Sequence, residues 1–281
     1  AKVSPSASEA FAEKQFAWQT VKKLQGELPK ANVTFVGSAA RDTGFKGDND
    51  IDVFAPWPRE MREEEIVKKT FNASRKAIRA KWETHYAEHP YLQAKIGKFK
   101  VEVIPCFKIA RHEGIKSAVD RSPLHMAFLQ ERLTQEQRKD VRILKKFLKN
   151  AGLYGAELAV QGFSGLLCEY LILNYRTLEG LVENASKWKP PVLVEFDPAD
   201  SDKKTFGTPL VVIDAVDRNR NVAAVVSETN VHRFISLCRA FWNEPSEKFF
   251  FLQHKPPSAP LLRKKIKERK THFALIELKT P

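Results

Sequence analysis

The sequence predicts an α+β protein in three parts: a mixed-sheet domain over residues 1–125, a mainly helical domain over 126–245 and a short basic α/β segment over 246–281. Strand-like segments bounded by turn residues alternate with helical patterns in the first part. Apolar residues recur at helical spacing in the second part. Lysine and arginine dominate the last part, which separates it from the helical domain.

In the first domain the patterns predict an amphipathic helix, several short strands and a charged helix. The amphipathic helix covers residues 7–28, with its apolar face formed by Phe11, Trp18, Val21, Leu24 and Leu28. The strands cover residues 33–36, 51–55 and 99–104, with further strand-like alternation around Tyr86, and the charged helix covers residues 59–76. Pro29, Pro56 and Pro105 end these elements, because proline has no N–H to donate.

The second and third parts are predicted in the same way. Helical periodicity covers residues 126–150, 164–182 and 229–242, and a buried strand covers residues 210–213. Residues 189–209 are rich in Pro, Asp and Lys, which predicts a loop. The basic end of the chain closes with an alternating strand over residues 273–278.

Composition excludes several classes of protein. With 281 residues, of which 43% are hydrophobic and 10% aromatic, the chain buries real cores and is not a disordered protein. No apolar run approaches the roughly 20 residues of a membrane-spanning helix, and the polar, Ala-rich start predicts no signal peptide. Three scattered cysteines indicate a reducing, cytoplasmic setting. The net charge of +13 favours a nucleic-acid partner.

The acidic residues around the second and last predicted strands suggest a metal site. Asp50 and Asp52 point to one side of their strand, and Glu102 faces away from the valines on either side of it. Three carboxylates offer the hard oxygen ligands that Mg²⁺ prefers, and two such metals activate a hydroxyl and stabilise a leaving pyrophosphate. Gly37 and Ser38 form a tight turn after a strand, where a backbone N–H and a hydroxyl would hold a triphosphate.

Asp-x-Asp alone is common, so a solvated strand edge or a Ca²⁺-binding loop is the alternative. The order of elements favours catalysis: a strand, a Gly-Ser turn, Asp-x-Asp and a later strand carboxylate follow one another.

This constellation resembles the nucleotidyltransferase superfamily of polymerase beta, and further segments make the chain similar to the archaeal class I CCA-adding enzymes. The matching segments begin with Gly37-Ser38-x-x-Arg41-x-Thr43, Asp50-Ile51-Asp52-Val53-Phe54, Tyr86-Ala87-Glu88-His89-Pro90-Tyr91 and Val103-Ile104-Pro105-Cys106-Phe107. They continue with Ser117 to His125, Arg142-Ile143-Leu144-Lys145, Gly152 to Glu157, Gly162-Phe163-Ser164-Gly165 and Arg220-Asn221-Val222-Ala223-Ala224. The resemblance covers essentially the whole chain.

The resemblance implies a palm-like nucleotidyltransferase domain that adds C, C and A to tRNA without a nucleic-acid template, using CTP, ATP and Mg²⁺. It implies that Asp50, Asp52 and Glu102 bind the catalytic metals and that Gly37, Ser38 and Arg41 lie near the triphosphate. It also implies that His89, Ser122, His125, Lys145, Tyr154 and Arg220 line the nucleotide pocket or the tRNA 3′ end, so that the helical domain binds nucleotide and RNA.

Two features depart from the family pattern. Family members usually carry Asp where this chain has Glu102, which is one methylene longer. They are also much longer, with a body and a tail that grip tRNA, so residues 246–281 correspond to the start of a truncated or reduced body domain. An oligoadenylate synthetase or poly(A) polymerase type of enzyme, and a non-catalytic RNA-binding module, are the alternative functions. The sequence does not define an oligomeric state.

Other residues carry competing interpretations. His85-x-x-Glu88-His89 matches the inverted zinc-peptidase pattern, but that chemistry needs a helix and Pro90 disfavours one. Without the resemblance, Lys145 is expected to be solvated, Tyr154 is as well explained by packing as by stacking on a base, and Arg220 by capping carbonyls.

The basic run over residues 261–270 predicts a solvated helix or a surface for an RNA backbone, which proteins recognise by shape and phosphates.

Overall fold

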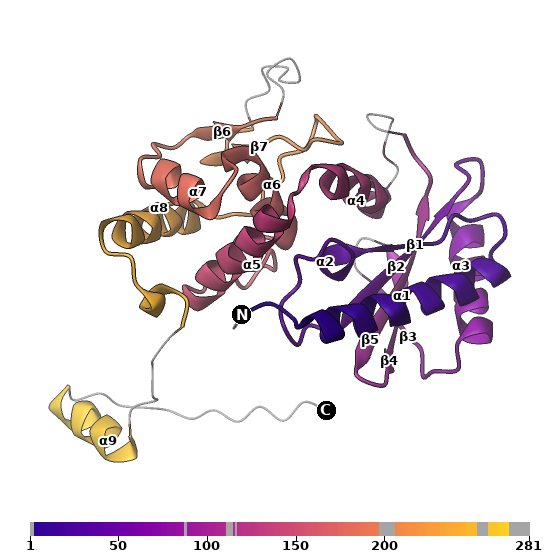
Figure 1. Ribbon diagram of the computed structural model, residues 1–281, viewed down its shortest axis with the longest axis horizontal. Helices are drawn as coiled ribbons and strands as arrows, with labels where there is room; N and C mark the ends of the chain where they lie inside the picture. The colour runs from indigo at the N-terminus through magenta and orange to yellow at the C-terminus, as the bar shows by residue number, and fades with distance from the viewer. Residues whose placement is uncertain are drawn as a thin grey trace. The chain divides into compact units, whose positions relative to one another are not determined.

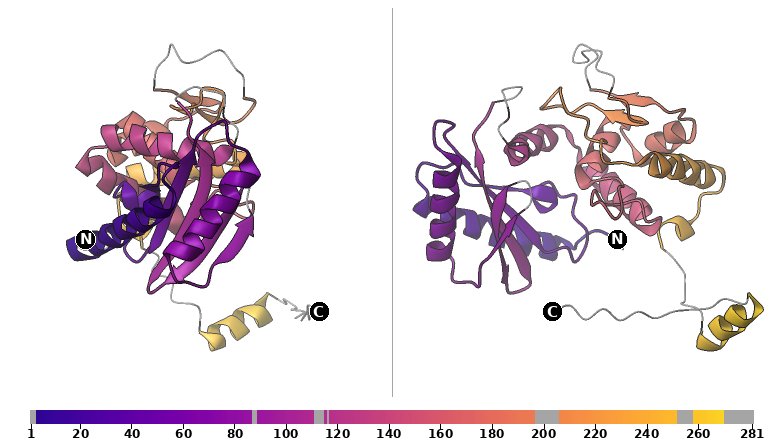
Figure 2. Two further views of the ribbon diagram at one scale, coloured as in Figure 1. Left: turned by 90° about the vertical axis from the view of Figure 1, so that its right-hand side faces the viewer. Right: turned by 180° about the vertical axis from the view of Figure 1, so that it is seen from behind.

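The computed structural model describes residues 3–86, 89–110, 115, 117–196, 206–251 and 258–269. The chain divides into two compact units, Ala1–Phe250 and Phe251–Pro281, and each is described by itself. Figure 1 labels the helices and strands of both units, and Figure 2 shows the same elements from two further directions.

A five-stranded mixed sheet forms the N-terminal half of the first unit, with strand order β1-β2-β5-β4-β3. Its strands are β1 (Thr34–Val36), β2 (Asp50–Trp57), β3 (Glu83–Tyr86), β4 (Pro90–Ile96) and β5 (Phe99–Phe107). The central pair, β2 with β5, is parallel, and the other neighbouring pairs are antiparallel. The predicted mixed sheet is therefore present, with β4 as a strand that the sequence patterns missed.

Helices α1 (Ala7–Glu27) and α3 (Glu63–Ala77) pack on this sheet, and α1 crosses one of its faces (Figures 1 and 2). One hydrophobic core joins both helices to the apolar side of β2 and β5. A capping box at Ser6 and Glu9 fixes the start of α1 by satisfying two backbone N–H groups that would otherwise lack partners.

The buried face of α1 differs from the predicted one. Phe11 is 68% exposed and Trp18 is 58% exposed, whereas Leu24 is fully buried. The buried line runs through Ala17, Val21, Leu24 and Leu28, whose spacing of three or four residues follows the helical repeat. Phe11 and Trp18 lie seven residues apart on a neighbouring stripe, so the prediction that they belong to the buried face is wrong.

Two strands continue beyond the prolines that were expected to end them. In the pairing of β2 with β5, Ala55 faces Pro105 and Pro56 faces Cys106. The pairing of β1 with β2 reaches only as far as Phe54, and the pairing of β4 with β5 only as far as Val103. Each proline therefore lies where its strand has a neighbour on one side, and a missing N–H is tolerated there.

The remainder of the first unit is mainly helical. Its helices are α4 (Arg121–Arg132), α5 (Gln135–Asn150), α6 (Gly165–Tyr175), α7 (Leu178–Ser186) and α8 (Glu228–Asn243). The periodic segment 126–150 is thus two helices, separated where the Thr134 capping box begins α5. A second hydrophobic core, built around Phe147, Tyr170 and Phe234, joins these helices.

A parallel strand pair, β6 (Val192–Val194) and β7 (Leu210–Val212), completes the helical half. The predicted loop over residues 189–209 therefore contains a short strand, while its residues 197–205 lie outside the described part. The predicted domain division near residue 125 falls inside α4 and stays a prediction.

The second unit contains helix α9 (Ala259–Glu268), so a helix covers most of the basic run. The strand predicted over residues 273–278 lies outside the described residues. No helix in the described part of the chain combines the length and the apolar character that crossing a membrane requires.

Two substitutions on α1 test which of its faces supports the fold. Leu24→Ala removes a fully buried side chain and is expected to lower the free energy of unfolding by about 2–5 kcal/mol. Trp18→Ala removes a larger but exposed side chain and is expected to change it by less than about 0.5 kcal/mol. Urea unfolding followed by circular dichroism measures both, and a larger loss for Trp18→Ala would contradict the described packing.

Candidate active site

Asp50, Asp52 and Glu102 lie on the face of the sheet opposite helices α1 and α3. Ile51 and Val53 are fully buried in the core shared with α1 and α3. Asp50 and Asp52 alternate with them along β2 and so face the other way. Asp52 is the parallel register partner of Glu102, and the alternation along β5 puts Glu102 on the same face as Asp52.

This grouping concentrates negative charge. The pKa of Asp52 is raised to about 7, first by burial and then by the neighbouring charges of Glu102 and Asp50, against the opposing charges of Arg41 and Lys100. Burial also raises the pKa of Asp50. A cation among these carboxylates would stabilise their ionised forms, which is the charge environment that a divalent metal needs.

As the side chains stand, Lys100 and not a set of converged carboxylates occupies this area. Its ammonium nitrogen lies 2.7 Å from Oε1 of Glu102 and 4.0 Å from Oδ1 of Asp50. Within the described ranges, no group of three or more Asp, Glu, His or Cys side chains is arranged to hold a metal ion. The three carboxylates lie on one face of the sheet, but their side chains do not meet at one point.

The turn after β1 brings the backbone close to Asp52. Gly37 begins the short helix α2 (Gly37–Ala40) with φ of +84°. A Cβ atom at this position would overlap Oδ2 of Asp52. Glycine is therefore required twice, for its backbone conformation and for the space that it leaves to the carboxylate.

A cavity of about 420 Å³ opens beside Asp52. Among the residues predicted for the site, it is lined by Gly37, Arg41, Asp52, His89, Glu102, Ser122 and His125. Apolar side chains complete the lining, namely Val36, Phe54, Tyr91, Ile104, Val119 and Leu166. The cavity thus combines the acidic strands with residues of α4 and the start of α6, which join it to the helical half.

The remaining predicted residues, Asp50, Ser38, Lys145, Tyr154 and Arg220, lie outside this lining. Ser38 faces Gly44 within its own loop and accepts a hydrogen bond from the Thr43 N–H through its carbonyl. Tyr154 packs edge-on against Phe45, with ring centroids 6.2 Å apart, and burial raises the pKa of its hydroxyl.

His89 is buried beside the cavity with 4% of its surface exposed. Its Nδ1 lies 3.1 Å from the Glu63 carboxylate, and its Nε2 has no hydrogen-bond partner among the described residues. His85 lies on β3, which rules out the helix that the zinc-peptidase pattern requires. Glu88, the remaining residue of that pattern, lies outside the described part.

A buried carboxylate that the sequence patterns missed, Glu169 on α6, holds the loop after α2. Its Oε1 accepts hydrogen bonds from Nε of Arg41 at 3.0 Å and from the Thr43 hydroxyl at 2.5 Å. Lys145, only 2% exposed, donates to the Thr43 carbonyl at 2.9 Å. The expectation that Lys145 is solvated is therefore wrong: its side chain is buried, and its ammonium group holds the loop after α2 through the Thr43 carbonyl.

The charge of Glu169 is balanced inside the protein. Burial alone would raise its pKa, but the charges of Arg41 and Lys145, with hydrogen bonds from Arg41 and Thr43, bring the pKa below its usual 4.5. The sequence held one clue, a single Glu within the apolar run of α6. A charged residue on such a helix needs a buried partner.

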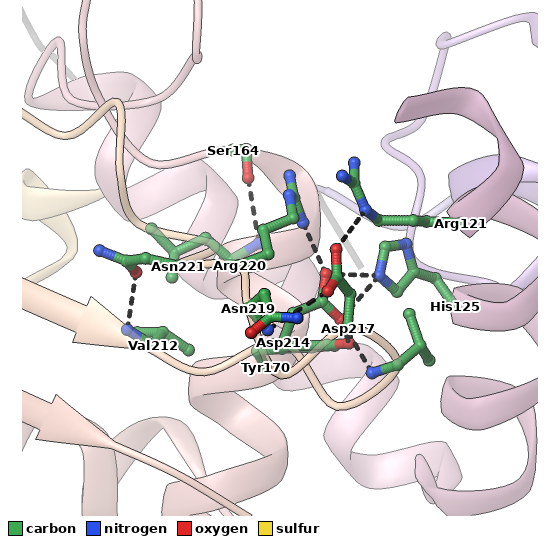
Figure 3. A network of polar contacts seen from close by, with 12 residues as sticks. Arg121, His125, Ser164, Tyr170, Val212, Asp214, Asp217, Asn219, Arg220 and Asn221 are labelled. Atoms are coloured by element: carbon green, nitrogen blue, oxygen red, sulfur yellow. Dashed lines mark hydrogen bonds and ion pairs between the residues drawn. The ribbon is translucent and has the colours of Figure 1, made fainter. Parts of the chain in front are cut away.

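Asp214 is the centre of a second buried network, also absent from the predicted site (Figure 3). Both of its carboxylate oxygens lie 2.9 Å from Nε2 of His125. Arg220 donates to it at 2.8 Å and the Tyr170 hydroxyl at 3.0 Å. Burial opposes ionisation, yet the hydrogen bonds and charges of these partners hold the pKa of Asp214 well below its usual range.

A second contact strengthens this junction, since Arg121 on α4 pairs with Asp217 at 2.9 Å (Figure 3). Both carboxylates lie in the segment after β7, whereas Arg121 and His125 lie on α4. Asp214 therefore holds His125, which lines the cavity, and also fixes Arg220, whose side chain remains one-third exposed.

Comparison with known families assigns both halves of the first unit. Residues 17–125 match the family model described as a nucleotidyltransferase domain. Residues 139–251 match the model described as the second domain of tRNA nucleotidyltransferase.

Archaeal relatives match most of the chain. It is 43% identical to the CCA-adding enzyme of Pyrobaculum neutrophilum over 234 residues, which cover 83% of this chain and 54% of that enzyme. It is 41% identical to the CCA-adding enzyme of Halobacterium salinarum over 258 residues, covering 91% of this chain and 56% of that enzyme. The chain spans about half the length of the curated relatives that it matches.

Solved structures share the fold. The Cid1 poly(U) polymerase, solved with Mg and 3′-dATP, superposes with a TM-score of 0.69 at 12% identity, covering 88% of this chain and 94% of that one. The E. coli CdnC structure with ATP gives a TM-score of 0.64 at 17% identity, covering 89% and 91%. The predicted α+β class with a mixed-sheet nucleotidyltransferase domain is thereby confirmed.

The space between Gly37 and Asp52 can be tested with a matched pair of glycine variants. Gly37 and Gly47 both have positive φ, +84° and +86°, but nothing lies within 4 Å of a Cβ at Gly47. Gly47→Ala is expected to lower the free energy of unfolding by about 1 kcal/mol through backbone strain alone. Gly37→Ala is expected to lower it by clearly more, because Asp52 must also move. Equal losses in urea unfolding would show that the overlap is unimportant.

The buried carboxylate of α6 predicts a pH dependence of stability. Because the pKa of Glu169 is lowered from 4.5 in the folded state, its contribution is complete above that pH and is lost as the pH falls through the folded value. Glu169→Gln leaves Arg41 and Lys145 without their anion and is expected to lower the free energy of unfolding by about 3 kcal/mol at neutral pH.

Urea unfolding of wild type and Glu169→Gln at several pH values is the measurement. The difference between them should narrow as the pH drops below 4.5. Glu131→Gln, whose side chain is 73% exposed, is the control and should stay within about 0.5 kcal/mol of wild type throughout. A difference for Glu169→Gln that stays constant down to acid pH would refute the ion-pair assignment.

Proposed function

Because this chain belongs to the archaeal family of CCA-adding enzymes, we propose that it adds CMP and AMP from CTP and ATP to the 3′ end of tRNA without a nucleic-acid template. The observation that carries the proposal is the pairing of β2 with β5, which lines up Asp52 and Glu102 under the Gly37 turn. The match to relatives extends over the helical half as well, so we propose that this half binds the nucleotide and the RNA end.

We propose Mg²⁺ as the metal, held by Asp50, Asp52 and Glu102. These are hard oxygen ligands on one sheet face, and the pKa of Asp52 is raised by burial and by the negative charges of Glu102 and Asp50, which a cation would offset. When bound, the metal makes the terminal ribose hydroxyl a better nucleophile for in-line attack on the α-phosphate and stabilises the departing pyrophosphate. The carboxylates would hold the metal at this face of the sheet.

The triphosphate is proposed to lie at the turn after β1. Gly37 and Arg41 both line the cavity, and Glu169 fixes the orientation of the Arg41 guanidinium, which would neutralise phosphate charge. Ser38 would offer its hydroxyl to the same phosphates. Lys145 acts indirectly in this proposal, because its ammonium group donates to the Thr43 carbonyl and keeps the loop in place.

The nucleoside and the RNA end are proposed to occupy the helical side of the cavity. Ser122 and His125 line it from α4, and the unpaired Nε2 of buried His89 offers a hydrogen bond from the sheet side. Arg220, which Asp214 orients and which is partly exposed, is proposed to read the edge of a base. Tyr154 would contact the RNA end, although in this structure its ring packs on Phe45.

The proposed partner is tRNA, with a cytoplasmic location and no membrane. The net charge of +13 favours binding to an RNA backbone. Helix α9 contributes Arg263, Lys264, Lys265 and Lys267 on exposed positions, and it is proposed to contact phosphates of the acceptor stem.

Labelled CTP and ATP distinguish the candidate functions. Incorporation of CMP and then AMP into tRNA that lacks its CCA end supports the proposal, whereas ATP chains formed without tRNA would support an oligoadenylate synthetase or poly(A) polymerase type. Absence of any transfer, together with retained RNA binding, would support the non-catalytic RNA-binding module. The presence of Glu102 where the family usually has Asp is an argument for that module.

Two carboxylate variants test the site directly. Asp50→Asn and Asp52→Asn are expected to reduce CMP and AMP incorporation on the order of 10³-fold, while filter binding of tRNA persists. Asp48→Asn is the control, because Asp48 is an exposed carboxylate just before β2 that accepts a hydrogen bond from the Phe45 N–H in its own turn and is not among the proposed ligands. Full activity in either site variant would refute the metal assignment.

A further inference from the structure

We propose that Lys100 is a resident cation of the acidic site: its ammonium group occupies the gap between Asp50 and Glu102 when no divalent ion is bound, and it must leave before a metal can engage all three carboxylates. The inference rests on the proposed function, since it takes these carboxylates as the metal ligands. It makes Lys100 a positioning residue that sets how readily the site takes up its metal.

The strand register creates the gap. In the parallel pairing of β2 with β5, Asp50 faces Lys100 and Asp52 faces Glu102. Ile51 and Val101, the pair between them, are fully buried in the core. The four charged side chains therefore share one face of the sheet as a rectangle with three acidic corners and one basic corner.

The contacts show what Lys100 does at its corner. Its nitrogen lies 2.7 Å from Oε1 of Glu102, which is a charge-assisted hydrogen bond, and 4.0 Å from Oδ1 of Asp50. Gln93 on β4 donates to the same Oε1 at 3.0 Å. Since β4 and β2 flank β5 on opposite sides, Gln93 binds this oxygen from the β4 side, while Lys100 lies between Glu102 and Asp50 of β2.

The longer side chain of glutamate makes this arrangement possible. Glu102 has one methylene more than the Asp that is usual in the family, so its carboxylate can reach Lys100 on its own strand. This explains why the three carboxylates share a face yet do not converge on one point. Release of Oε1 by Lys100, together with that by Gln93, then lets Glu102 turn toward Asp52.

The chemistry of lysine suits a cation that has to leave. Its ammonium group is a point charge on a flexible stem, and its side chain is 48% exposed, so it can swing into solvent. While in place, it offsets part of the repulsion among the carboxylates, which favours the metal-free protein. A divalent ion must compete with this internal charge, and the metal affinity is reduced accordingly.

Titration calorimetry with Mn²⁺, in the absence of nucleotide, measures the effect. Lys100→Gln is expected to bind Mn²⁺ roughly tenfold more tightly than wild type, the change produced by removing about 1.4 kcal/mol of competition. Lys100→Arg keeps the charge and should stay within about threefold of wild type. Lys98→Gln is the matched control, since Lys98 lies two residues away over the Phe99 ring and should leave the affinity unchanged.

Thermal unfolding provides a second readout that does not depend on activity. Without metal, Lys100→Gln should unfold at a lower temperature than wild type, because the carboxylates lose their internal cation. Mn²⁺ should then raise the unfolding temperature of Lys100→Gln more than that of wild type. The same shift in both proteins would contradict the role of Lys100.

The outcomes separate this inference from the proposed function. Equal Mn²⁺ affinity in wild type and Lys100→Gln overturns the inference and leaves the metal site standing. Failure of both to bind Mn²⁺ overturns the metal assignment and this inference with it. Equally tighter binding in Lys98→Gln and Lys100→Gln would show a general effect of net charge, which also overturns the specific role of Lys100.

Discussion

The parallel pairing of β2 with β5 is the constraint on which the rest of the site depends. The two strands are adjacent in the sheet but separated in the chain by α3 and the β3–β4 hairpin, because a parallel pair needs a crossover connection. The register puts Ile51 beside Val101 and Val53 beside Val103 in the core. The same alternation puts Asp52 beside Glu102 on the opposite face, so one set of hydrogen bonds fixes both the core and the acidic site.

The helical half contributes through two buried carboxylates. Glu169 holds Arg41 and Thr43 of the loop after α2, and Asp214 holds His125 and Arg220. A buried charge is costly unless its partners are equally well placed, so each carboxylate makes the position of its cation nearly obligatory. The cavity therefore receives its basic and imidazole groups already oriented.

Local patterns were enough to predict much of the sheet and the acidic face. Asp50, Asp52 and Glu102 could be placed on one face because strand alternation depends only on neighbouring residues. The buried position of Lys145 and the roles of Glu169 and Asp214 could not be predicted, since each depends on a partner more than 80 residues away in the chain. Phe11 and Trp18 misled for a related reason, because apolar character alone does not say which stripe of a helix meets the sheet.

Short elements were missed for a different physical reason. Strand β6 spans Val192–Val194 within a segment of turn-forming composition, and its only described strand partner is β7. Pro56 and Pro105 were expected to end strands, but each lies beyond the point where its strand has a second neighbour, so the missing N–H leaves no hydrogen bond unmade on that side. In both cases the pairing with another strand decides whether the segment is a strand, and local sequence patterns do not show which strands pair.

The bond between Arg41 and Glu169 also bears on motion. It joins the end of α2, on the sheet side of the cavity, to α6 on the helical side, and it lies almost entirely out of water. Opening the cavity by drawing these two elements apart would strand a carboxylate and a guanidinium group in a dry interior, at an expense of several kcal/mol. A motion that widens the cavity without this expense is one that keeps Arg41 and Glu169 together, so this ion pair restricts how the two sides of the cavity can separate.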